Sequence, residues 1–528
     1  MFNLAGPSAL VNAMRIAQLL TDQAVLGHLK YQGKGTACYL DAASLAILWM
    51  TLTLTVMTRG VSGTINMLCS QALGAGNRKL SDTWLVTGLI LSVAAAAIIS
   101  ALWLLTEDVV SLYAANQTLG SASDHAGSCA DGPGDPVKLA ASYAIHSTAY
   151  TLPTLWTECV NAWLLAERII RPQLCVYALA LVGNLALNIV LVHGIGGWHG
   201  LGFLGSPLAT TATRVLQLIV LVCLLPLTKV ELPRLRFREA LKPSRLRTFL
   251  MQALPRCVSA ALEEIALQAC GALAGRLGSV ETDAHNSMLM TFFWLTAPLY
   301  GVGTATQQRM GYFLGEGQPR AARTVGVLCL YVLSGLSIVV AAVLVATRGY
   351  LGVVFSNSPE VVDMVAAITP LVAGAYTVVG LFYASMATLN GQGRPLPVAL
   401  AFFFGAFLVS PSLAYVLSFV VGCCGSVKLF GLWLGLIAGY SITTLISGAA
   451  VLRSDWAHLS KLAQERSEVQ HASGQVQQPD GSRSPRDGSG HMSRAPVMEA
   501  PLLQNEVTPP PAYQHPSAAD AETWQEAD

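Results

Sequence analysis

A few charged residues lie inside long apolar segments of the sequence, where a charge is costly. An ionised side chain at the centre of a membrane-spanning helix costs about 2.5 to 3.5 kcal/mol on insertion scales, so each one needs a physical reason to be there. Asp22 lies in the first apolar segment. On a helix its face also carries Asn12, Arg15 and Gln18, a polar stripe that we expect to line a cavity. Asp22 is therefore a candidate ion-coupling carboxylate; the alternative is that Asp22 and Arg15 only neutralise neighbouring helices.

Two adjacent glutamates, Glu263 and Glu264, lie in the seventh apolar segment. Neighbouring helix positions diverge by about 100°, so only one of the two can point squarely into a shared cavity. Helical spacing favours Glu264, which stacks with Gln268 at i+4 and shares a face with Gly271 and Gly275. We expect one of the two glutamates to be a second ion-coupling group, with Gln268 as a polar neighbour.

The amides Asn184 and Asn188 lie one helical turn apart in the fifth segment. They either join neighbouring helices by hydrogen bonds, a role worth about 1 kcal/mol each, or help Asp22 to hold a proton or a cation. Glu158 is a weaker candidate cavity residue and fits a packing partner equally well. Arg59 and Arg214 are interpreted as packing partners or as arginines that snorkel from helix ends.

These residues require a membrane-spanning scaffold. The 528 residues are 53% hydrophobic and 12% charged, with a mean hydropathy of +0.52, which is far more apolar than a soluble protein. A membrane-spanning helix needs about 20 apolar residues. Twelve segments satisfy this requirement, near 6–29, 42–68, 84–105, 139–165, 174–193 and 204–226, then 250–275, 286–308, 325–346, 362–389, 396–419 and 429–452.

The two sets of six segments indicate an internal duplication. Gln71–Lys79, which contains Gly74 and Gly76, returns in altered form as Tyr312–Arg320, which contains Gly315 and Gly317. Duplicated multi-span halves are typical of transporters. We predict an all-α integral membrane protein with twelve transmembrane helices in two pseudo-symmetric six-helix lobes. Its parts are an N-lobe at 1–228, a cytoplasmic connector at 229–249, a C-lobe at 250–452 and a disordered cytoplasmic tail at 453–528.

The distribution of Lys and Arg predicts the orientation. Most of these residues in the loops fall on one side, so the positive-inside rule places the connector, both Gly-x-Gly turns and both termini in the cytoplasm. On the opposite side Asn116 begins an Asn-Gln-Thr sequon, and we expect glycosylation there.

The tail is rich in Ser, Gln and Pro and cannot bury a core, apart from a short juxtamembrane helix near Trp456. Pro510, Pro511 and Tyr513 form a PPxY motif of the kind that WW domains bind through a polyproline II helix. A WW-domain protein is therefore a candidate partner, and a chance proline-rich stretch is the alternative.

Several classes of activity are excluded by the motifs that the sequence lacks. It contains no Walker phosphate-binding loop, no His-Glu-x-x-His and no Gly-x-Ser-x-Gly, so we expect no enzymatic activity. The eleven cysteines show no metal-ligand spacing, and we expect neither a metal nor a cofactor. The net charge of +1 and the lack of a basic patch argue against nucleic acid as a partner.

Five short motifs resemble the multidrug and toxic compound extrusion (MATE) family of secondary transporters, in its eukaryotic form. The resemblance extends from about residue 5 to 452 and rests on Leu68–Asn77, Gly27–Leu29, Pro207–Thr210, Gly311–Arg323 and Leu389–Gly393. It implies two six-helix lobes around a central cavity that opens alternately to the two sides of the membrane.

The resemblance also implies roles for individual residues. By position, Asp22 resembles the ion-coupling carboxylate of the first lobe, and Asn184, Asn188 and Thr210 resemble its network. Asn188 stands where many prokaryotic members have an aspartate, which disfavours a sodium site.

In the second lobe, Glu263 resembles the carboxylate that eukaryotic members use in the seventh span, whereas spacing favours Glu264, so both remain candidates. Gln268 stands where such members have a further glutamate. The second lobe is thus poorer in acid than relatives that export cations.

Taken with the resemblance, these residues lead us to expect a secondary active antiporter. It would export organic solutes such as drugs, organic cations or metabolites in exchange for protons, with Na⁺ as the alternative coupling ion. We expect a monomer in contact with membrane lipid, in the plasma membrane or in a vacuolar or lysosomal membrane. Two other functions stay open: a lipid or lipid-linked flippase of the same superfamily, and a non-transporting receptor or scaffold that acts through its PPxY tail.

Overall fold

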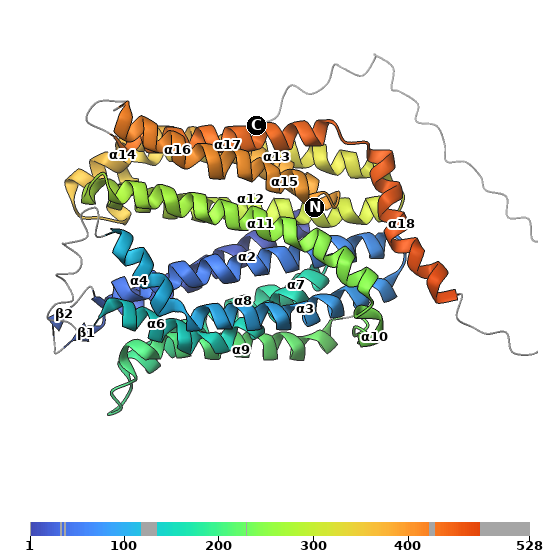
Figure 1. The fold of residues 1–528 in the computed structure, drawn as a ribbon, viewed down its shortest axis with the longest axis horizontal. Coiled ribbons are helices and arrows are strands. Elements are labelled where there is room, and N and C mark those ends of the chain that lie inside the picture. The colour runs from blue at the N-terminus through green and yellow to red at the C-terminus, as the bar shows by residue number, and fades with distance from the viewer. Residues whose placement is uncertain are drawn as a thin grey trace, which may run out of the picture. The chain divides into compact units, whose positions relative to one another are not determined.

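The computed structural model describes residues 2–31, 34–35, 38–117, 135–228, 230–421 and 428–475, nearly all of them in helices (Figure 1). Three predicted tail residues, Pro510, Pro511 and Tyr513, lie outside these ranges. Asn116 falls in the last turn of α4 (Thr106–Gln117), and its side chain is outside the described part of the chain.

Ten helical segments of the described residues are long and apolar enough to cross a membrane. In the first half they are α2 (Cys38–Gly74), α3 (Arg78–Leu104), α8 (Arg171–Asn188) with η2 (Ile189–His193), and α9 (Gly205–Leu224) with η3 (Gly202–Leu204) and η4 (Leu225–Leu227). In the second half they are α11 (Pro243–Gly275), α12 (Ser279–Gly315), α13 (Pro319–Leu351) with η5 (Gly352–Val354), α14 (Pro359–Gly391), the run of α15 (Pro395–Phe402), η6 (Phe403–Val409), α16 (Ser410–Tyr415) and η7 (Val416–Val420), and α17 (Leu429–Leu452).

Two further helical segments complete the predicted set. The first is α1 (Phe2–Gly27), which carries the polar stripe of Asp22. The second is a run of α6 (Pro136–Ser147), η1 (Thr148–Tyr150) and α7 (Thr151–Ala166), in which a 3₁₀ turn interrupts the helix. Each of the twelve predicted spans therefore coincides with helix, and the all-α fold is confirmed.

The smaller elements are a hairpin of β1 (Lys30–Tyr31) with β2 (Lys34–Gly35), the short helix α10 (Phe237–Ala240) and α18 (Trp456–Gln475). Helix α11 begins at Pro243, so it includes the end of the predicted connector 229–249. Helix α18 lies where the juxtamembrane helix near Trp456 was predicted, and it extends over 20 residues of the predicted tail.

Proline and glycine set the helix ends. Proline stands in the first turn of α8, α11, α13, α14 and α15, where its missing N–H and fixed φ are tolerated. The second glycine of each Gly-x-Gly turn ends a helix in the left-handed conformation: φ is +73° at Gly76 and +81° at Gly317. After Gly76, Asn77 N–H donates to the Ala72 carbonyl at 2.8 Å, which closes the turn.

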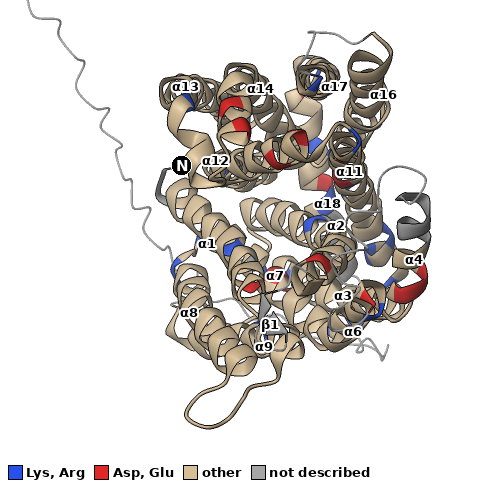
Figure 2. Cartoon of the chain, turned by 90° about the vertical axis from the view of Figure 1, so that its left-hand side faces the viewer, with Lys and Arg blue, Asp and Glu red and all other residues tan. Residues whose placement is uncertain are grey.

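The two halves pack against each other in a reciprocal way. The first helix of each half contacts the second helix of the other, α1 with α12 and α11 with α2, and α2 also contacts α12 (Figures 1 and 2). A Cβ atom added at Gly74 would lie 2.0 Å from the Tyr312 carbonyl oxygen, and one added at Gly315 would lie 2.1 Å from the Gln71 carbonyl oxygen. The duplicated turns therefore contact each other through equivalent atoms, as an internal repeat requires.

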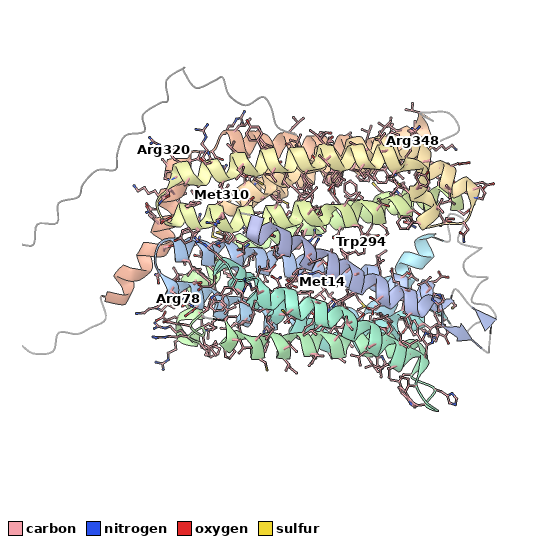
Figure 3. The ribbon with its side chains drawn as sticks, turned by 180° about the vertical axis from the view of Figure 1, so that it is seen from behind. Met14, Arg78, Trp294, Met310, Arg320 and Arg348 are labelled. Carbon is pink, nitrogen blue, oxygen red and sulfur yellow. The ribbon has the colours of Figure 1, made fainter. Side chains whose placement is uncertain are left out.

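The ends of the helices follow the predicted alternation of loops. Arg78 and Arg320 lie at one end of the helices and Arg348 at the other (Figure 3). Helix α18 runs across the end that carries the two Gly-x-Gly turns and contacts α2, α12 and α13 (Figure 1). Viewed along the helices, charged residues occupy little of the spans, and α1 lies between α8 and α12 (Figure 2).

Candidate functional site

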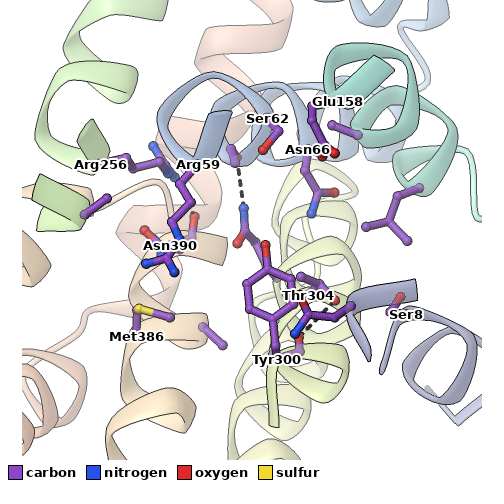
Figure 4. Close-up of a pocket in the computed structure, with 18 of the residues that line it drawn as sticks. Ser8, Arg59, Ser62, Asn66, Glu158, Arg256, Tyr300, Thr304, Met386 and Asn390 are labelled. Carbon is purple, nitrogen blue, oxygen red and sulfur yellow. Dashed lines mark hydrogen bonds between the residues drawn. The ribbon is translucent and has the colours of Figure 1, made fainter. Parts of the chain in front are cut away.

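The larger of the two cavities described here lies between the two halves. It contains about 1240 Å³ of empty space, part of it open to solvent, and α1, α2, α7 and α8 line it from the first half. From the second half α11, α12, α14 and α15 line it, and Figure 4 shows its polar residues. We call it the central cavity.

One wall of the central cavity carries the ion pair of Arg15 and Glu158. The Arg15 Nη2 atom lies 2.6 Å from Glu158 Oε1, and the Tyr177 hydroxyl donates to the same oxygen at 2.5 Å. The Arg15 guanidinium also lies over the Tyr177 ring, 5.4 Å from its centroid. These contacts join α1, α7 and α8, so the charges of this wall are satisfied within the first half.

A second ion pair crosses from one half to the other. Arg59 of α2 lies 2.7 Å from Glu263 and 3.5 Å from Glu264 of α11. Tyr440 of α17 donates to Glu263 at 3.4 Å. Glu263 lines the central cavity, whereas Glu264 contacts Arg59 without being among the lining residues.

The third cation of the cavity is Arg256 of α11, which is 5% exposed. Its Nη1 atom donates to the Gln252 carbonyl at 2.8 Å and its Nη2 atom to the Asn390 carbonyl at 3.1 Å. Its Nε atom has no partner, and no carboxylate of the described residues forms an ion pair with it. Arg256 is therefore a buried cation held only by neutral groups.

The second cavity, of about 490 Å³, lies inside the first half and contains Asp22. The carboxylate is 6% exposed and accepts hydrogen bonds from two helices: Asn188 Nδ2 of α8 at 2.7 Å and Thr210 Oγ1 of α9 at 2.8 Å. Asn184 Nδ2 donates to Thr210 Oγ1 at 3.4 Å. The three helices α1, α8 and α9 are thus joined at one carboxylate.

The Asp22 site combines one carboxylate with one cation and unused acceptors. The cation is Arg214, which lines the same cavity and lies in the middle of α9 rather than near its end. The Oδ1 atoms of Asn184 and Asn188 are buried without a partner among the described residues, as are both amide atoms of Gln18. No group of three or more His, Cys, Asp or Glu side chains suited to a metal ion occurs in the described parts of the chain. A single carboxylate that accepts hydrogen bonds from an amide and a hydroxyl, in a cavity that already holds the Arg214 cation, is suited to gaining and losing one proton.

The sequence and structure of known proteins identify the family. The MatE family model matches residues 7–190 and 255–416, which is more than half of the chain. The chain belongs to the MatE family. It is a MATE transporter of the eukaryotic type and a multi-pass membrane protein, and the family is one of transporters rather than enzymes.

Relatives of this MATE transporter span nearly the same length. It is 24% identical to Protein DETOXIFICATION 16 of Arabidopsis thaliana, over 88% of this chain and 90% of the relative. It is also 24% identical to Multidrug and toxin extrusion protein 1 of Xenopus tropicalis, over 88% and 75% of the two chains. The crystal structure of the eukaryotic MATE transporter AtDTX14 matches with a TM-score of 0.75 and 22% identity, over 88% and 97% of the two chains.

The polar stripe on α1 of this MATE transporter is divided between the two cavities. Asn12 and Arg15 line the central cavity, whereas Gln18 and Asp22 line the second. Gln268, predicted beside the glutamates, has an exposed side chain and lines neither cavity. The face of α11 that carries it is therefore turned away from both cavities.

Two arginines of the central cavity were misjudged or missed from the sequence. Arg59 was interpreted as lying near a helix end, but α2 extends from Cys38 to Gly74, so Arg59 lies well inside it. Arg256 was not singled out. The sequence feature that points to Arg256 is its spacing: it lies seven residues before Glu263, so the two ionisable residues share one helix face within one apolar segment.

Proposed function

We propose that this MATE transporter is a secondary antiporter that exports organic solutes in exchange for protons, with Asp22 as the proton-coupling residue. The observation that carries the proposal is the Asp22 site: one buried carboxylate that receives hydrogen bonds from Asn188 and Thr210 on two other helices. The names of the relatives, detoxification and multidrug and toxin extrusion, support an organic solute as the exported substrate.

Protonation would change the contacts of α1 directly. The ionised carboxylate accepts two hydrogen bonds, and bonds to an ionised acceptor are worth about 1.5 to 3 kcal/mol. A proton on Asp22 removes the charge and converts one oxygen into a donor, so the Asn188 and Thr210 contacts must rearrange. The free energy of holding α1 against α8 and α9 then depends on whether a proton is bound.

Antiport requires that the proton and the substrate favour opposite conformations. Asp22 lies in the second cavity and the central cavity lies between the halves, yet α1 lines both. A proton at Asp22 can therefore change the position of α1, and α1 also forms part of the wall of the central cavity. Sodium is a weaker candidate because the site has one carboxylate and already contains the Arg214 cation; replacing the pH gradient of the assay below with a sodium gradient tests it.

The test is gradient-driven transport by the purified protein in proteoliposomes. We expect Asp22→Asn, which keeps the size of the side chain and cannot titrate, to abolish substrate accumulation driven by a pH gradient. The matched control is Asp108→Asn, because Asp108 is an exposed carboxylate on α4 outside both cavities. Accumulation by Asp22→Asn equal to that of the unmodified protein would remove Asp22 from the mechanism.

The membrane of residence and the oligomeric state are part of the proposal as well. We propose a monomer in the plasma membrane or in a vacuolar or lysosomal membrane, where a pH difference is available to drive export. Fluorescence imaging of the full chain with organelle markers, together with light scattering of the purified protein, tests both points.

A further inference from the structure

We propose that the central cavity binds organic anions, with the anionic group of the substrate on Arg256. This inference rests on the proposed transport function, because it names the class of substrate that is transported. It is tested by measuring ligand binding to the purified protein. It specifies the class of solute, which the family alone leaves open.

The central cavity offers no free carboxylate to an organic cation. Of the described residues that line it, the acidic ones are Glu158 and Glu263. Glu158 is paired with Arg15 at 2.6 Å and Glu263 with Arg59 at 2.7 Å. An organic cation could use either carboxylate only by displacing an arginine, which would leave that arginine without its partner.

Arg256 is in the opposite situation. Its side chain is 5% exposed, and it donates to the backbone and side-chain oxygens of Gln252 and to the Asn390 carbonyl. Its Nε atom has no partner among the described residues. A buried charge without a counterion is costly, and the cost is offset when an opposite charge binds next to it. The planar guanidinium also suits a carboxylate, which it can bind through two parallel hydrogen bonds.

The position of Arg256 is fixed by the packing of the two halves. Its side chain lies against Gly63 of α2, where an added Cβ would be 3.4 Å from the Arg256 Cδ atom. The Gly63 carbonyl accepts a hydrogen bond from Gln307 of α12 at 2.9 Å. Figure 4 shows Arg59, Arg256 and Asn390 on the same side of the cavity. An anion on Arg256 would therefore lie where α2, α11 and α14 meet, at the boundary of the two lobes.

The rest of the lining suits an aromatic or apolar body. Tyr300, Tyr383, Met386 and Phe402 line the cavity and supply aromatic and thioether surface. Asn161 is 2% exposed, and neither of its amide atoms has a partner in the described part of the chain, so it can bind a hydroxyl or carbonyl group of the ligand. The ligand class is therefore an organic anion with a carboxylate at one end and an aromatic body.

Two dyes with one ring skeleton and opposite charge provide the test. We would measure fluorescence polarisation of fluorescein, an anion, and of rhodamine 123, a cation, with the purified full chain at pH 7.5. Because the dyes have similar size and shape, the comparison reports mainly charge. We expect the unmodified protein to bind fluorescein at least about tenfold more tightly than rhodamine 123.

Substitutions at one position then locate the charge. We expect Arg256→Gln to weaken fluorescein binding by about tenfold or more and to leave rhodamine 123 binding unchanged, because one charge-assisted contact is lost. Arg256→Lys keeps the charge but cannot form the two parallel hydrogen bonds, so its fluorescein affinity should lie between those of the unmodified protein and Arg256→Gln. The matched control is Arg276→Gln, an exposed arginine that follows the end of the same helix, which should behave as the unmodified protein.

Tighter binding of rhodamine 123, no binding of either dye, or unchanged fluorescein binding by a folded Arg256→Gln would each overturn the proposal. If Arg256→Gln does not fold, the charge preference of the unmodified protein still decides. Failure of the antiport proposal can be told apart from failure of this one, because the binding assay needs no gradient. If Asp22→Asn transports as the unmodified protein does while the preference for fluorescein still depends on Arg256, only the coupling role of Asp22 is removed.

Discussion

The close contact of Gly74 with the Tyr312 backbone predicts how a single added methyl group changes the separation of the two halves. An added Cβ at Gly74 would meet the Tyr312 backbone, at 2.0 Å from its carbonyl oxygen and 2.8 Å from its carbonyl carbon. Backbone atoms cannot rotate away as a flexible side chain can. Since real Cβ atoms essentially never come within 3.0 Å of another heavy atom, Gly74→Ala must separate α2 from α12 by roughly 1 Å at this end.

The size of the effect follows from the cost of overpacking. One additional methyl in a tightly packed contact costs about 1 to 3 kcal/mol. Under the proposed antiport mechanism the cost applies only to the conformation in which the two turns touch. The ratio of molecules with the turns in contact to molecules with the turns apart should then fall by about 5- to 150-fold. Gly315→Ala meets the Gln71 carbonyl oxygen at 2.1 Å and should have the same effect, because the contact is reciprocal.

The assay is a distance measurement across this end of the molecule. Spin labels on Lys79→Cys and Arg320→Cys, two exposed residues beyond the two turns, report the separation by double electron–electron resonance. Cys175 and Cys223, which are exposed and free, are first replaced by serine. We expect Gly74→Ala to add or enlarge a population at longer distance.

A matched control separates the contact from the general effect of adding a methyl. Gly183 in α8 and Gly335 in α13 are helical glycines where an added Cβ meets no atom within 4 Å. Alanine at either position should leave the distance distribution unchanged and raise thermal stability slightly, since alanine is the better helix former. A Gly74→Ala distribution identical to that of these controls would refute the reasoning.

Two more predictions concern the tail and the pH response. Truncation after Gln475 should leave transport and thermal stability unchanged, whereas truncation after Asp455 removes α18 and should lower thermal stability. The reason is that Leu459 and Ser460 are buried against α12, and Ser460 donates to the Leu314 carbonyl at 3.0 Å. Equal melting temperatures of the two truncated proteins would contradict this. Thr210→Val removes a donor to the ionised Asp22, so the pH midpoint of transport should move to higher pH by about 1 to 2 units, and a midpoint that stays or falls would contradict it.

The sequence predicted the elements well because membrane spans follow from length and hydropathy alone. It also pointed to Asn184 and Asn188 as neighbours of Asp22. The two amides share one helical face, and an apolar segment offers a buried carboxylate few other hydrogen-bond donors. That Thr210 completes the site was implied only by family resemblance, since it lies on a different helix.

The central cavity was harder to predict for a physical reason. A helical pattern shows which residues share a face, but it does not show which neighbour that face meets. Glu264 and Gln268 share a face by spacing, yet Glu264 contacts Arg59 and Gln268 is exposed. The bridge from Arg59 to both glutamates joins positions more than 200 residues apart, and only the packing of the halves creates it.

Helix α1 connects the Asp22 site to the contact between the lobes. At one end Asp22 joins α1 to α8 and α9. Toward the other end α1 packs so closely on α12 that an added Cβ at Gly301 would lie 2.5 Å from the Ala5 carbonyl oxygen and 2.6 Å from the Ala9 nitrogen. A helix held tightly at both ends transmits a displacement instead of absorbing it. If protonation of Asp22 releases one end, the close contact at Gly301 requires α12 to respond. Helix α12 ends at Gly315, in the reciprocal turn that closes the two halves, so a single chain of packed backbone joins the carboxylate to that end of the central cavity.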